Sequence, residues 1–299
     1  MRVHVSGARG STPAPGPAFV RYGGHTSCLA LARDGADVSL LLDAGTGIRR
    51  VTGLLGGRPF DGAILLGHLH WDHTQGLPFF RAGDRPDARV DLHLPAQGVP
   101  GDAEDAPGDA QDAPGDAEAV LARALSPPHF PITPSGLRGR WRFHGLQPGR
   151  HEIAGFRVLA REIPHKGGRT FGYRVSDGGR TIAYLSDHHP AALGPGAHGH
   201  GPYHEAACDL AAGADVLFHD AQYLAAEWAE RSGFGHATVE YAVGLAEAAG
   251  VGRLVLFHHD PARSDDAIDA LTADARARAD VTVTAAVEGA VIDLPARDG

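Results

Sequence analysis

The stretch that decides the fold is His-Leu-His-Trp-Asp-His at residues 68–73, which directly follows the apolar run Gly-Ala-Ile-Leu-Leu-Gly at 62–67. The apolar run predicts a short buried strand. The first two histidines are two residues apart and point the same way in extended backbone, whereas the aspartate and the last histidine face a second position after the chain turns. Imidazole plus carboxylate is a ligand set for zinc, manganese or iron. The candidate ligands here are His68, His70, Asp72 and His73.

The motif therefore predicts a metal site at the end of a strand, where sites gather in layered α/β proteins. Two ions held side by side, about 3.5–4 Å apart, form the hydrolytic centre of many phosphatases and nucleases. The alternative interpretation is a set of exposed loop histidines with no metal.

The composition is that of a globular protein with a surplus of histidine. The 299 residues include 19 histidines, and histidine is the commonest metal ligand. The formal net charge of −9 gives no general attraction to a polyanion, so a small-molecule substrate is expected and nucleic acid is not. Two cysteines are too few for a disulfide framework, which favours a reduced, cytoplasmic protein. No segment approaches the roughly 20 apolar residues that cross a membrane, so no membrane partner is expected.

Strands and helices alternate along most of the chain, which predicts two sheets with helices outside them in a single domain spanning residues 1–299. We expect strands at residues 2–6, 27–32, 38–43, 62–67, 89–94, 140–145, 155–163, 170–176, 181–186, 215–219, 253–257, 281–285 and 290–294. We expect helices at about 46–55, 74–82, 117–125, 203–212, 221–231, 237–249 and 265–277.

Residues 95–119 break this pattern. The heptapeptide Pro-Gly-Asp-Ala-Glu-Asp-Ala at 100–106 is echoed at 107–113, and a third partial copy starts at Pro114. Each unit carries Pro-Gly and no Leu, Ile or Val, which excludes a coiled coil. The composition predicts an acidic, disordered surface insertion, with a functional acidic tether as the alternative.

The His-x-His-x-Asp-His motif resembles that of the metallo-β-lactamase superfamily, and further landmarks of that superfamily follow in order between about residues 3 and 260. They are Leu41-Leu42-Asp43-Ala44-Gly45, His165 after the 155–163 strand, Tyr184-Leu185-Ser186-Asp187, and Leu254-Val255-Leu256-Phe257-His258. The resemblance implies an α/β fold built as a four-layer αββα sandwich.

The same resemblance implies a role for each landmark residue. Three histidines would hold a first metal ion, and an aspartate with two histidines would hold a second. Asp187 would bridge them, because a carboxylate has two oxygens. Asp43 would hydrogen-bond the histidine motif from outside the ligand set. The first set is His68, His70 and His165, and the second is Asp72, His73 and His258.

Two further segments resemble the ribonuclease Z and cyclic phosphodiesterase branch, with phosphoribosyl cyclic phosphate phosphodiesterases nearest. They are Phe218-His219-Asp220-Ala221 and Gly235-His236-Ala237-Thr238. Ribonuclease Z often carries Glu where this chain has Asp220. Its long basic arm for tRNA is also replaced by the short acidic insertion.

Asp72 and His236 are the candidate catalytic residues, with His236 as proton donor to the leaving oxygen. A helix-start histidine without chemistry is the alternative for His236. His219 and Asp220 are expected to orient metal ligands from behind. Neighbours in a strand face opposite ways, so only one of His258 and His259 can reach the metals, and His259 stays open as the alternative.

The predicted function is a dinuclear hydrolase acting on a small or cyclic phosphodiester, with two divalent ions as cofactors. Zinc is the first choice, and manganese or iron is the alternative. Competing hypotheses are hydrolysis of a thioester, lactone or β-lactam, and a metal-binding pathway protein with little hydrolytic activity. Relatives in this branch are often dimers, so a homodimer is an expectation without an interface signal of its own.

Overall fold

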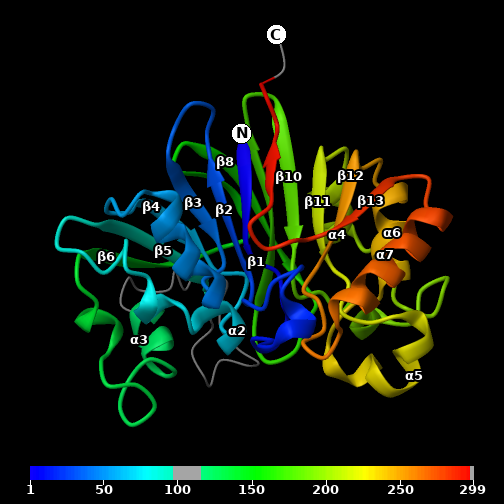
Figure 1. Ribbon diagram of the computed structural model, residues 1–299, viewed down its shortest axis with the longest axis horizontal. Coiled ribbons are helices and arrows are strands. Elements are labelled where there is room, and N and C mark those ends of the chain that lie inside the picture. The colour runs from blue at the N-terminus through cyan, green and yellow to red at the C-terminus, as the bar shows by residue number, and fades with distance from the viewer. Residues whose placement is uncertain (97–115, 297–299) are drawn as a thin grey trace, which may run out of the picture.

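Two seven-stranded sheets lie face to face at the centre of the molecule (Figure 1). The computed structural model describes residues 1–96 and 116–296. The first sheet has the order β14-β1-β2-β3-β4-β5-β6, and its strands from β3 to β6 run parallel. Its strands are β1 (Arg2–Gly7), β2 (Cys28–Ala32), β3 (Val38–Leu42), β4 (Asp61–Leu65), β5 (Arg89–Pro95), β6 (Arg140–Leu146) and β14 (Val291–Asp293).

The second sheet has the order β13-β12-β11-β10-β9-β8-β7, and its strands from β10 to β13 run parallel. Its strands are β7 (Gly149–Ile153), β8 (Phe156–Ile163), β9 (Thr170–Asp177), β10 (Arg180–Leu185), β11 (Val216–Asp220), β12 (Arg253–Phe257) and β13 (Thr282–Ala285).

Helices cover the outer faces, with α4, α6 and α7 over the second sheet and α2 and α3 on the side of the first (Figure 1). The α-helices are α1 (Val51–Leu54), α2 (Trp71–Thr74), α3 (Asp116–Ala122), α4 (Glu205–Ala211), α5 (Trp228–Arg231), α6 (Val239–Ala248) and α7 (Asp265–Arg278). The 3₁₀ turns are η1 (Pro17–Phe19), η2 (Thr46–Arg50), η3 (Leu77–Phe79), η4 (Pro134–Gly136), η5 (Pro190–Leu193), η6 (Ala225–Glu227) and η7 (Ser232–Phe234). Within the described ranges, no helix has the length and apolar character to cross a membrane.

Three hydrophobic cores lie between these layers. They form because successive side chains of a strand point to opposite faces of its sheet. In β10, Ile182 and Tyr184 face the core between the sheets, whereas Ala183 and Leu185 face the core under α4 and α6. In the first sheet, β3 sends Leu41 to a third core beneath η2 and α1. Strands buried on both faces require nearly continuous apolar runs, as the sequence shows. The predicted α/β sandwich with helices outside two sheets is confirmed.

The parallel strands explain where the polar residues gather. Asp43 follows β3, and the 68–73 motif follows β4 in the first sheet. Asp187, Asp220 and His258 lie at the ends of β10, β11 and β12 in the second sheet. Carboxyl ends of parallel strands meet at one edge of a sheet. Packing the two sheets face to face places both sets of strand ends at a common rim.

Two predicted helices differ from the structure, and one strand was not predicted. The predicted helix at 74–82 is instead the short α2 followed by η3, because Gly76 and Pro78 interrupt a continuous α-helix. The predicted helix at 221–231 shrinks to η6 and α5. Strand β7 was not predicted; it pairs with β8 through a turn in which Ala154 and Gly155 both have positive φ.

The predicted insertion at 95–119 lies for the most part outside the described residues. Only its edges are described, at the end of β5 and in α3. The single domain over residues 1–299 stays a prediction.

Candidate metal centre

The rim between the two sheets holds clustered imidazole and carboxylate groups that can hold metal ions. In each of three groups, one ligand atom per residue lies within 4.8 Å of the others. The first group is His68, His70, His165 and Asp187; the second is Asp72, His73, Asp187 and His258; the third is Asp220, His236 and His258. The structure thus brings together all seven residues that the sequence predicts as ligands.

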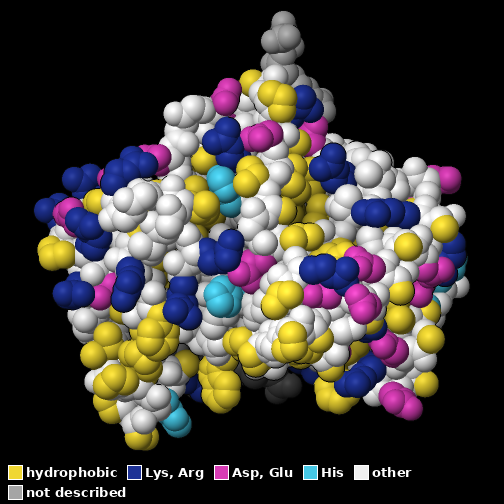
Figure 2. Space-filling model, viewed as in Figure 1, with side chains coloured by type: hydrophobic (Ala, Val, Ile, Leu, Met, Phe, Trp, Pro, Cys, Tyr) yellow, Lys and Arg dark blue, Asp and Glu magenta, His cyan; other side chains and the backbone are white. Residues whose placement is uncertain are grey.

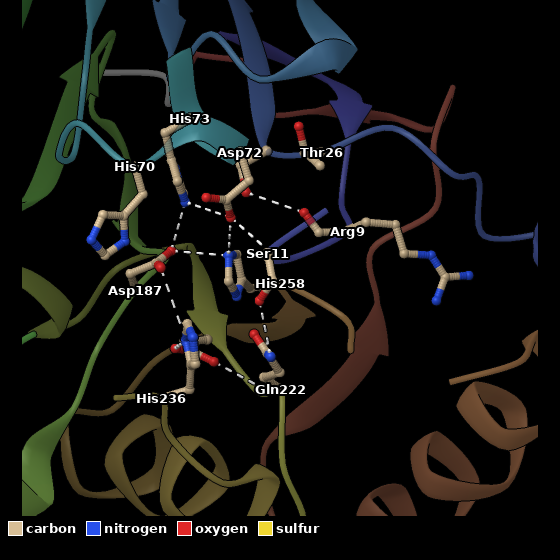
Figure 3. Close-up of polar contacts among 12 residues, drawn as sticks. Arg9, Ser11, Thr26, His70, Asp72, His73, Asp187, Gln222, His236 and His258 are labelled. Carbon is tan, nitrogen blue, oxygen red and sulfur yellow. Dashed lines mark hydrogen bonds and ion pairs between the residues drawn. The ribbon is translucent and has the colours of Figure 1, made fainter. Parts of the chain in front are cut away.

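The second group is the tighter one (Figure 3). The Nε2 atom of His73 lies 2.9 Å from Asp187 Oδ1 and 3.1 Å from Asp72 Oδ2. The Nε2 atom of His258 lies 3.1 Å from each of the same two oxygens. Two imidazole nitrogens and two carboxylate oxygens therefore converge on one point.

The other oxygen of Asp187 faces the first group. Asp187 Oδ2 lies 3.4 Å from His165 Nε2 and 3.6 Å from His68 Nε2. His165 Nε2 is also 3.3 Å from His70 Nδ1. The two oxygens of one carboxylate thus point at two different sets of imidazoles, which is the geometry that a bridging ligand requires.

Buried ligand atoms without hydrogen bonds show that this donor set fits metal ions. Among the described residues, His68 Nε2, His73 Nε2 and Asp187 Oδ1 are buried and have no hydrogen-bond partner. A buried polar atom left unsatisfied costs about 1–3 kcal/mol. All three atoms point into the cluster, where divalent cations would satisfy them.

Asp43 orients His73, as the resemblance implied. Asp43 Oδ2 accepts from His73 Nδ1 at 2.7 Å and from the hydroxyl of Tyr184 at 2.6 Å, while Oδ1 accepts from the Gly67 amide at 2.7 Å. With the proton of His73 held on Nδ1, its Nε2 is free to bind metal. His165 is held in a similar way, because its Nδ1 donates to the carbonyl of Gly235 at 2.7 Å.

The charges of the cluster favour cation binding. Burial raises the pKa of Asp187, but the surrounding His258, His73 and His68 outweigh it and hold that pKa well below its usual range. Burial lowers the pKa of His165 to about 4, and it also keeps the pKa of His68 well below its ordinary value. At neutral pH the site therefore offers an ionised Asp187 beside the neutral imidazoles of His68 and His165, which is the protonation state that metal ligands need. Around His73, by contrast, the charges of neighbouring carboxylates outweigh burial and raise its pKa well above the ordinary value.

His236 lies beside the cluster and is paired with Asp220. His236 Nδ1 donates to Asp220 Oδ2 at 2.9 Å and lies 3.9 Å from Asp187 Oδ2. Burial lowers the pKa of His236, but the charge of Asp220 and the hydrogen bond to it prevail and raise that pKa to about 9. The imidazole is therefore protonated at neutral pH before any metal binds.

The structure corrects the expected role of His219 and Asp220. We expected both to orient metal ligands, but neither side chain hydrogen-bonds the side chain of a predicted ligand. Asp220 instead holds His236, and it also accepts from the backbone amides of His188 and Gln222. His219 donates to the Asp220 carbonyl and contacts the ring of His188. They are the last two residues of β11, whereas the predicted ligands follow the ends of β4, β8, β10 and β12.

The geometry favours His258 over His259 as the residue that faces the metals. His259 Nε2 donates to the Ala286 carbonyl at 2.9 Å, away from the cluster. His258 has a left-handed backbone with φ of 58°, which turns its side chain into the rim. Gly10 makes room for that ring, because a Cβ at residue 10 would overlap the imidazole.

Sequence reasoning missed several residues that support the site. The Ser11 amide donates to Asp72 Oδ2 at 2.7 Å, and Tyr184 contacts Asp43 as described above. Arg9 is fully buried; its guanidinium donates to the carbonyls of Gly23 and Arg263 and lies 3.5 Å from Asp265. The Gly- and Pro-rich loop after β1 was the available signal for Ser11, whereas nothing local in the sequence marks Arg9 as buried.

Three cations that lie in or near the segments carrying the site, Arg21, Lys166 and Arg169, have partners of their own. Arg21 pairs with acidic residues of α7, and Arg169 pairs with Glu162 and the Ala96 carbonyl. The ammonium of Lys166 donates to the Gly233 carbonyl. None of the three contacts the metal cluster.

A hollow of about 370 Å³ opens over the cluster. Its walls carry two exposed aromatic side chains, Trp71 at 74% and Phe234 at 58% exposure. The remaining lining residues are Ser11, Leu69, His70, Asp72, His165, Asp187 and His236. A small, open hollow with metal ligands at its floor is an arrangement that can bind and hydrolyse an anionic ester.

Comparison with known proteins agrees with this fold and site. A family model described as a β-lactamase superfamily domain matches residues 39–259. The chain therefore belongs to the β-lactamase superfamily, and its histidine–aspartate cluster is able to bind metal. It is also a homologue of ribonuclease Z. The ribonuclease Z of Salinibacter ruber (strain DSM 13855 / M31) is 30% identical over 281 residues, covering 78% of this chain and 79% of that protein.

Solved structures support the fold. The metallo-β-lactamase fold protein YhfI from Bacillus subtilis has a TM-score of 0.67 at 19% identity, covering 98% of this chain and 99% of that one. A diphosphatase from the PhnP family has a TM-score of 0.67 at 18% identity, covering 99% of this chain and 98% of that one.

The homology overturns the expectation that nucleic acid is not a partner. That expectation rested on the net charge of −9, whereas the Salinibacter relative is named as a ribonuclease. Net charge averages over the whole surface, but binding of a polyanion depends on the charge next to the site. The expectation was wrong for that reason.

Proposed function

We propose that this protein is a dinuclear, metal-dependent phosphodiesterase. The observation that supports the proposal is the position of Asp187, whose two carboxylate oxygens each face a different set of candidate ligands. In this assignment His68, His70 and His165 hold one ion, and Asp72, His73 and His258 hold the other. Zinc is the metal we expect, because the donors are imidazoles with few carboxylates. Manganese and iron accept the same donors.

When bound, two divalent ions would supply an activated water molecule near neutral pH and would neutralise charge on the non-bridging oxygens of a phosphate. The residues of this chain do the rest. Asp43 and Gly235 hold His73 and His165 in the tautomer that presents Nε2. The Ser11 amide fixes the outer oxygen of Asp72.

His236 is the proton donor of this proposal. Asp220 accepts from its Nδ1, so the Nε2–H of the same ring is available to protonate a leaving oxygen. Its raised pKa keeps that proton in place at neutral pH. Asp220 is therefore a positioning residue that acts through His236.

The minimal substrate that we propose is a small or cyclic phosphodiester. The hollow over the metals, about 370 Å³, lies at the lower end of the usual range for ligand pockets, about 300–1,000 Å³. The same hollow would take one nucleotide linkage of a longer chain, which is the chemistry named for the ribonuclease Z relative. Thioesters, lactones and β-lactams stay as competing substrates for the same metals.

The test is hydrolysis of bis(p-nitrophenyl) phosphate by protein loaded with zinc or manganese and by protein stripped with a chelator. We expect turnover that disappears on stripping and returns when either metal is added, with two metal ions per chain by elemental analysis. Protein that holds two ions and leaves this diester intact would refute the proposal. A thioester and a lactone assayed in parallel would identify the competing activities.

A further inference from the structure

A second and larger hollow lies beside the metal centre. Its volume is about 1100 Å³, and it is open to solvent between the η2–α1 segment and η3. Three arginines and one aromatic ring stand out in its lining. Its residues are His25, Thr46, Arg49, Arg50, Thr52, Gly53, Gln75, Pro78, Phe79, Arg81 and Asp84.

The hollow concentrates positive charge on a chain whose net charge is negative. Arg49 and Arg81 are exposed, and neither has an ion pair or hydrogen bond within the described parts of the chain. Arg50 is partly neutralised by Glu288 at 3.0 Å. The single acidic residue of the lining, Asp84, is already bound by Arg138 at 2.9 Å. Two guanidinium groups are thus free to bind an anion.

The two hollows are separated by one turn of helix. Trp71 lines the hollow over the metals, and Gln75 lines the basic one. Residues four apart in a helix lie on the same face, about 6 Å apart along the axis. A chain molecule whose reacting phosphate lies over the metals can therefore pass α2 and continue into the second hollow.

Exposed aromatic rings accompany the cations along this path. Trp71 is 74% exposed at the metal hollow, and Phe79 is 56% exposed in the basic one. Phe79 is held edge-to-face by Phe130 with 5.9 Å between ring centroids, so its orientation is supported from one side. Figure 2 shows Arg side chains, with acidic side chains among them, over the half of the molecule that contains β3 to β6. Exposed rings interleaved with unpaired cations are typical of surfaces that bind single-stranded nucleic acid.

We infer that the hollow formed by Arg49, Arg81 and Phe79 binds the part of a single-stranded polynucleotide that flanks the scissile phosphodiester. The inference rests on the proposed phosphodiesterase function and names the substrate class of that site. Arg49 and Arg81 contact backbone phosphates, while Trp71 and Phe79 stack on bases. A small diester fills the first hollow alone and leaves the second one empty. The hollow beside α2 is therefore a specificity site for long substrates.

The experiment compares three variants of the metal-loaded protein on substrates of different length. The test variant is Arg49→Gln/Arg81→Gln, which removes both charges at similar size. The matched control is Arg253→Gln, an exposed arginine at the start of β12 outside both hollows. Substrates are bis(p-nitrophenyl) phosphate, a diribonucleotide and a fluorescent single-stranded hexaribonucleotide, each at 50 and 200 mM salt.

We expect the test variant to lose kcat/KM on the hexamer and to keep wild-type activity on the small diester. Each phosphate contact to a single strand contributes about 0.7 to the slope of log affinity against log salt. Between 50 and 200 mM salt, wild-type protein should therefore lose about seven-fold more affinity for the hexamer than the test variant, which lacks two of these contacts. The control variant should match wild type throughout. Phe79→Ala should weaken binding of the hexamer without changing the salt dependence of that binding.

Two results would overturn the inference. One is an equal change, or no change, on the hexamer and the small diester in the test variant. The other is an effect as large on the diribonucleotide as on the hexamer, which would mean that a single terminal phosphate occupies the hollow. If wild-type protein hydrolyses none of the three substrates, the proposed function is refuted, but the inference about the second hollow is not. Hexamer binding by fluorescence anisotropy then decides the inference, because the test variant must still lose affinity and salt dependence relative to the control.

Discussion

The pair formed by His236 and Asp220 gives the sharpest prediction about catalysis. Replacing Asp220 with Asn removes the charge that opposes burial of the imidazolium while keeping the size of the side chain. The pKa of His236 is about 9 in the presence of Asp220, against an ordinary value of 6.5. The difference corresponds to about 3 kcal/mol of preference for the protonated ring. Without that charge, burial lowers the pKa of His236, and only the weaker effects of Asp187 and Asp72 are left to raise it.

The consequence for rate follows from the protonated fraction of His236. At pH 8 a group with a pKa of about 9 is roughly 90% protonated, whereas one with a pKa of 6.5 is roughly 3% protonated. We therefore expect Asp220→Asn to lower kcat/KM at pH 8 by up to about 30-fold. The alkaline limb of the pH profile should move to lower pH. Bound metal ions lower both values, but the direction of the difference stays the same.

The assay is kcat/KM for bis(p-nitrophenyl) phosphate from pH 5 to 10, with metal content measured in the same samples. His236→Gln is the matched control: it should retain metal, lose about 10²–10⁴ in rate, and lack the alkaline limb. An Asp220→Asn protein with two metals per chain and an unshifted alkaline limb would refute the role of His236 as proton donor. The pair should also stabilise the fold below pH 6.5, and this contribution should disappear as pH rises through about 9.

The remaining predictions concern the metals and the buried arginine. Asp187→Ala should lose both metal ions and all activity together, as measured by elemental analysis and turnover; retention of either ion would contradict the bridging assignment. His258→Ala should lower metal content by one ion per chain, whereas His259→Ala should leave metal content unchanged, and the reverse result would exchange their roles. Arg9→Met should lower the free energy of unfolding in urea by about 3–5 kcal/mol, because it removes the buried partner charge of Asp265, which keeps only the half-exposed Arg21 at 3.9 Å, and leaves the carbonyls of Gly23 and Arg263 without their donor; a loss below about 1 kcal/mol would show that this pair is not structural.

Local patterns in the sequence were enough to predict most strands and part of the metal site. Apolar runs of strand length, broken by turn residues, were enough to place most strands, because burial on two faces demands them. The spacing of His68, His70, Asp72 and His73 fixes their relative directions within one short segment. These four candidate ligands could therefore be predicted without knowledge of the fold. The resemblance to a known superfamily supplied His165, Asp187 and His258, which no local pattern connects to that motif.

The tertiary structure decided which distant groups meet. Asp187 faces two sets of imidazoles only because the ends of β4 and β10 come from different sheets packed at one rim. His258 rather than His259 points inward in a left-handed turn after β12, whereas alternation in the sequence said only that one of the two could face the metals. The pairing of Asp220 with His236 also depends on how separate segments pack.

Charge distribution was the other property that the sequence concealed. A sum over the chain gives −9, yet Arg49 and Arg81 lie together beside the metal centre without acidic partners among the described residues. Many other arginines form ion pairs with carboxylates, and Arg9 is fully buried. Electrostatic attraction depends on distance, so the local surface counts for more than the total. Spacing in the sequence therefore marked the first four candidate metal ligands, whereas three-dimensional packing decided which charges face a substrate.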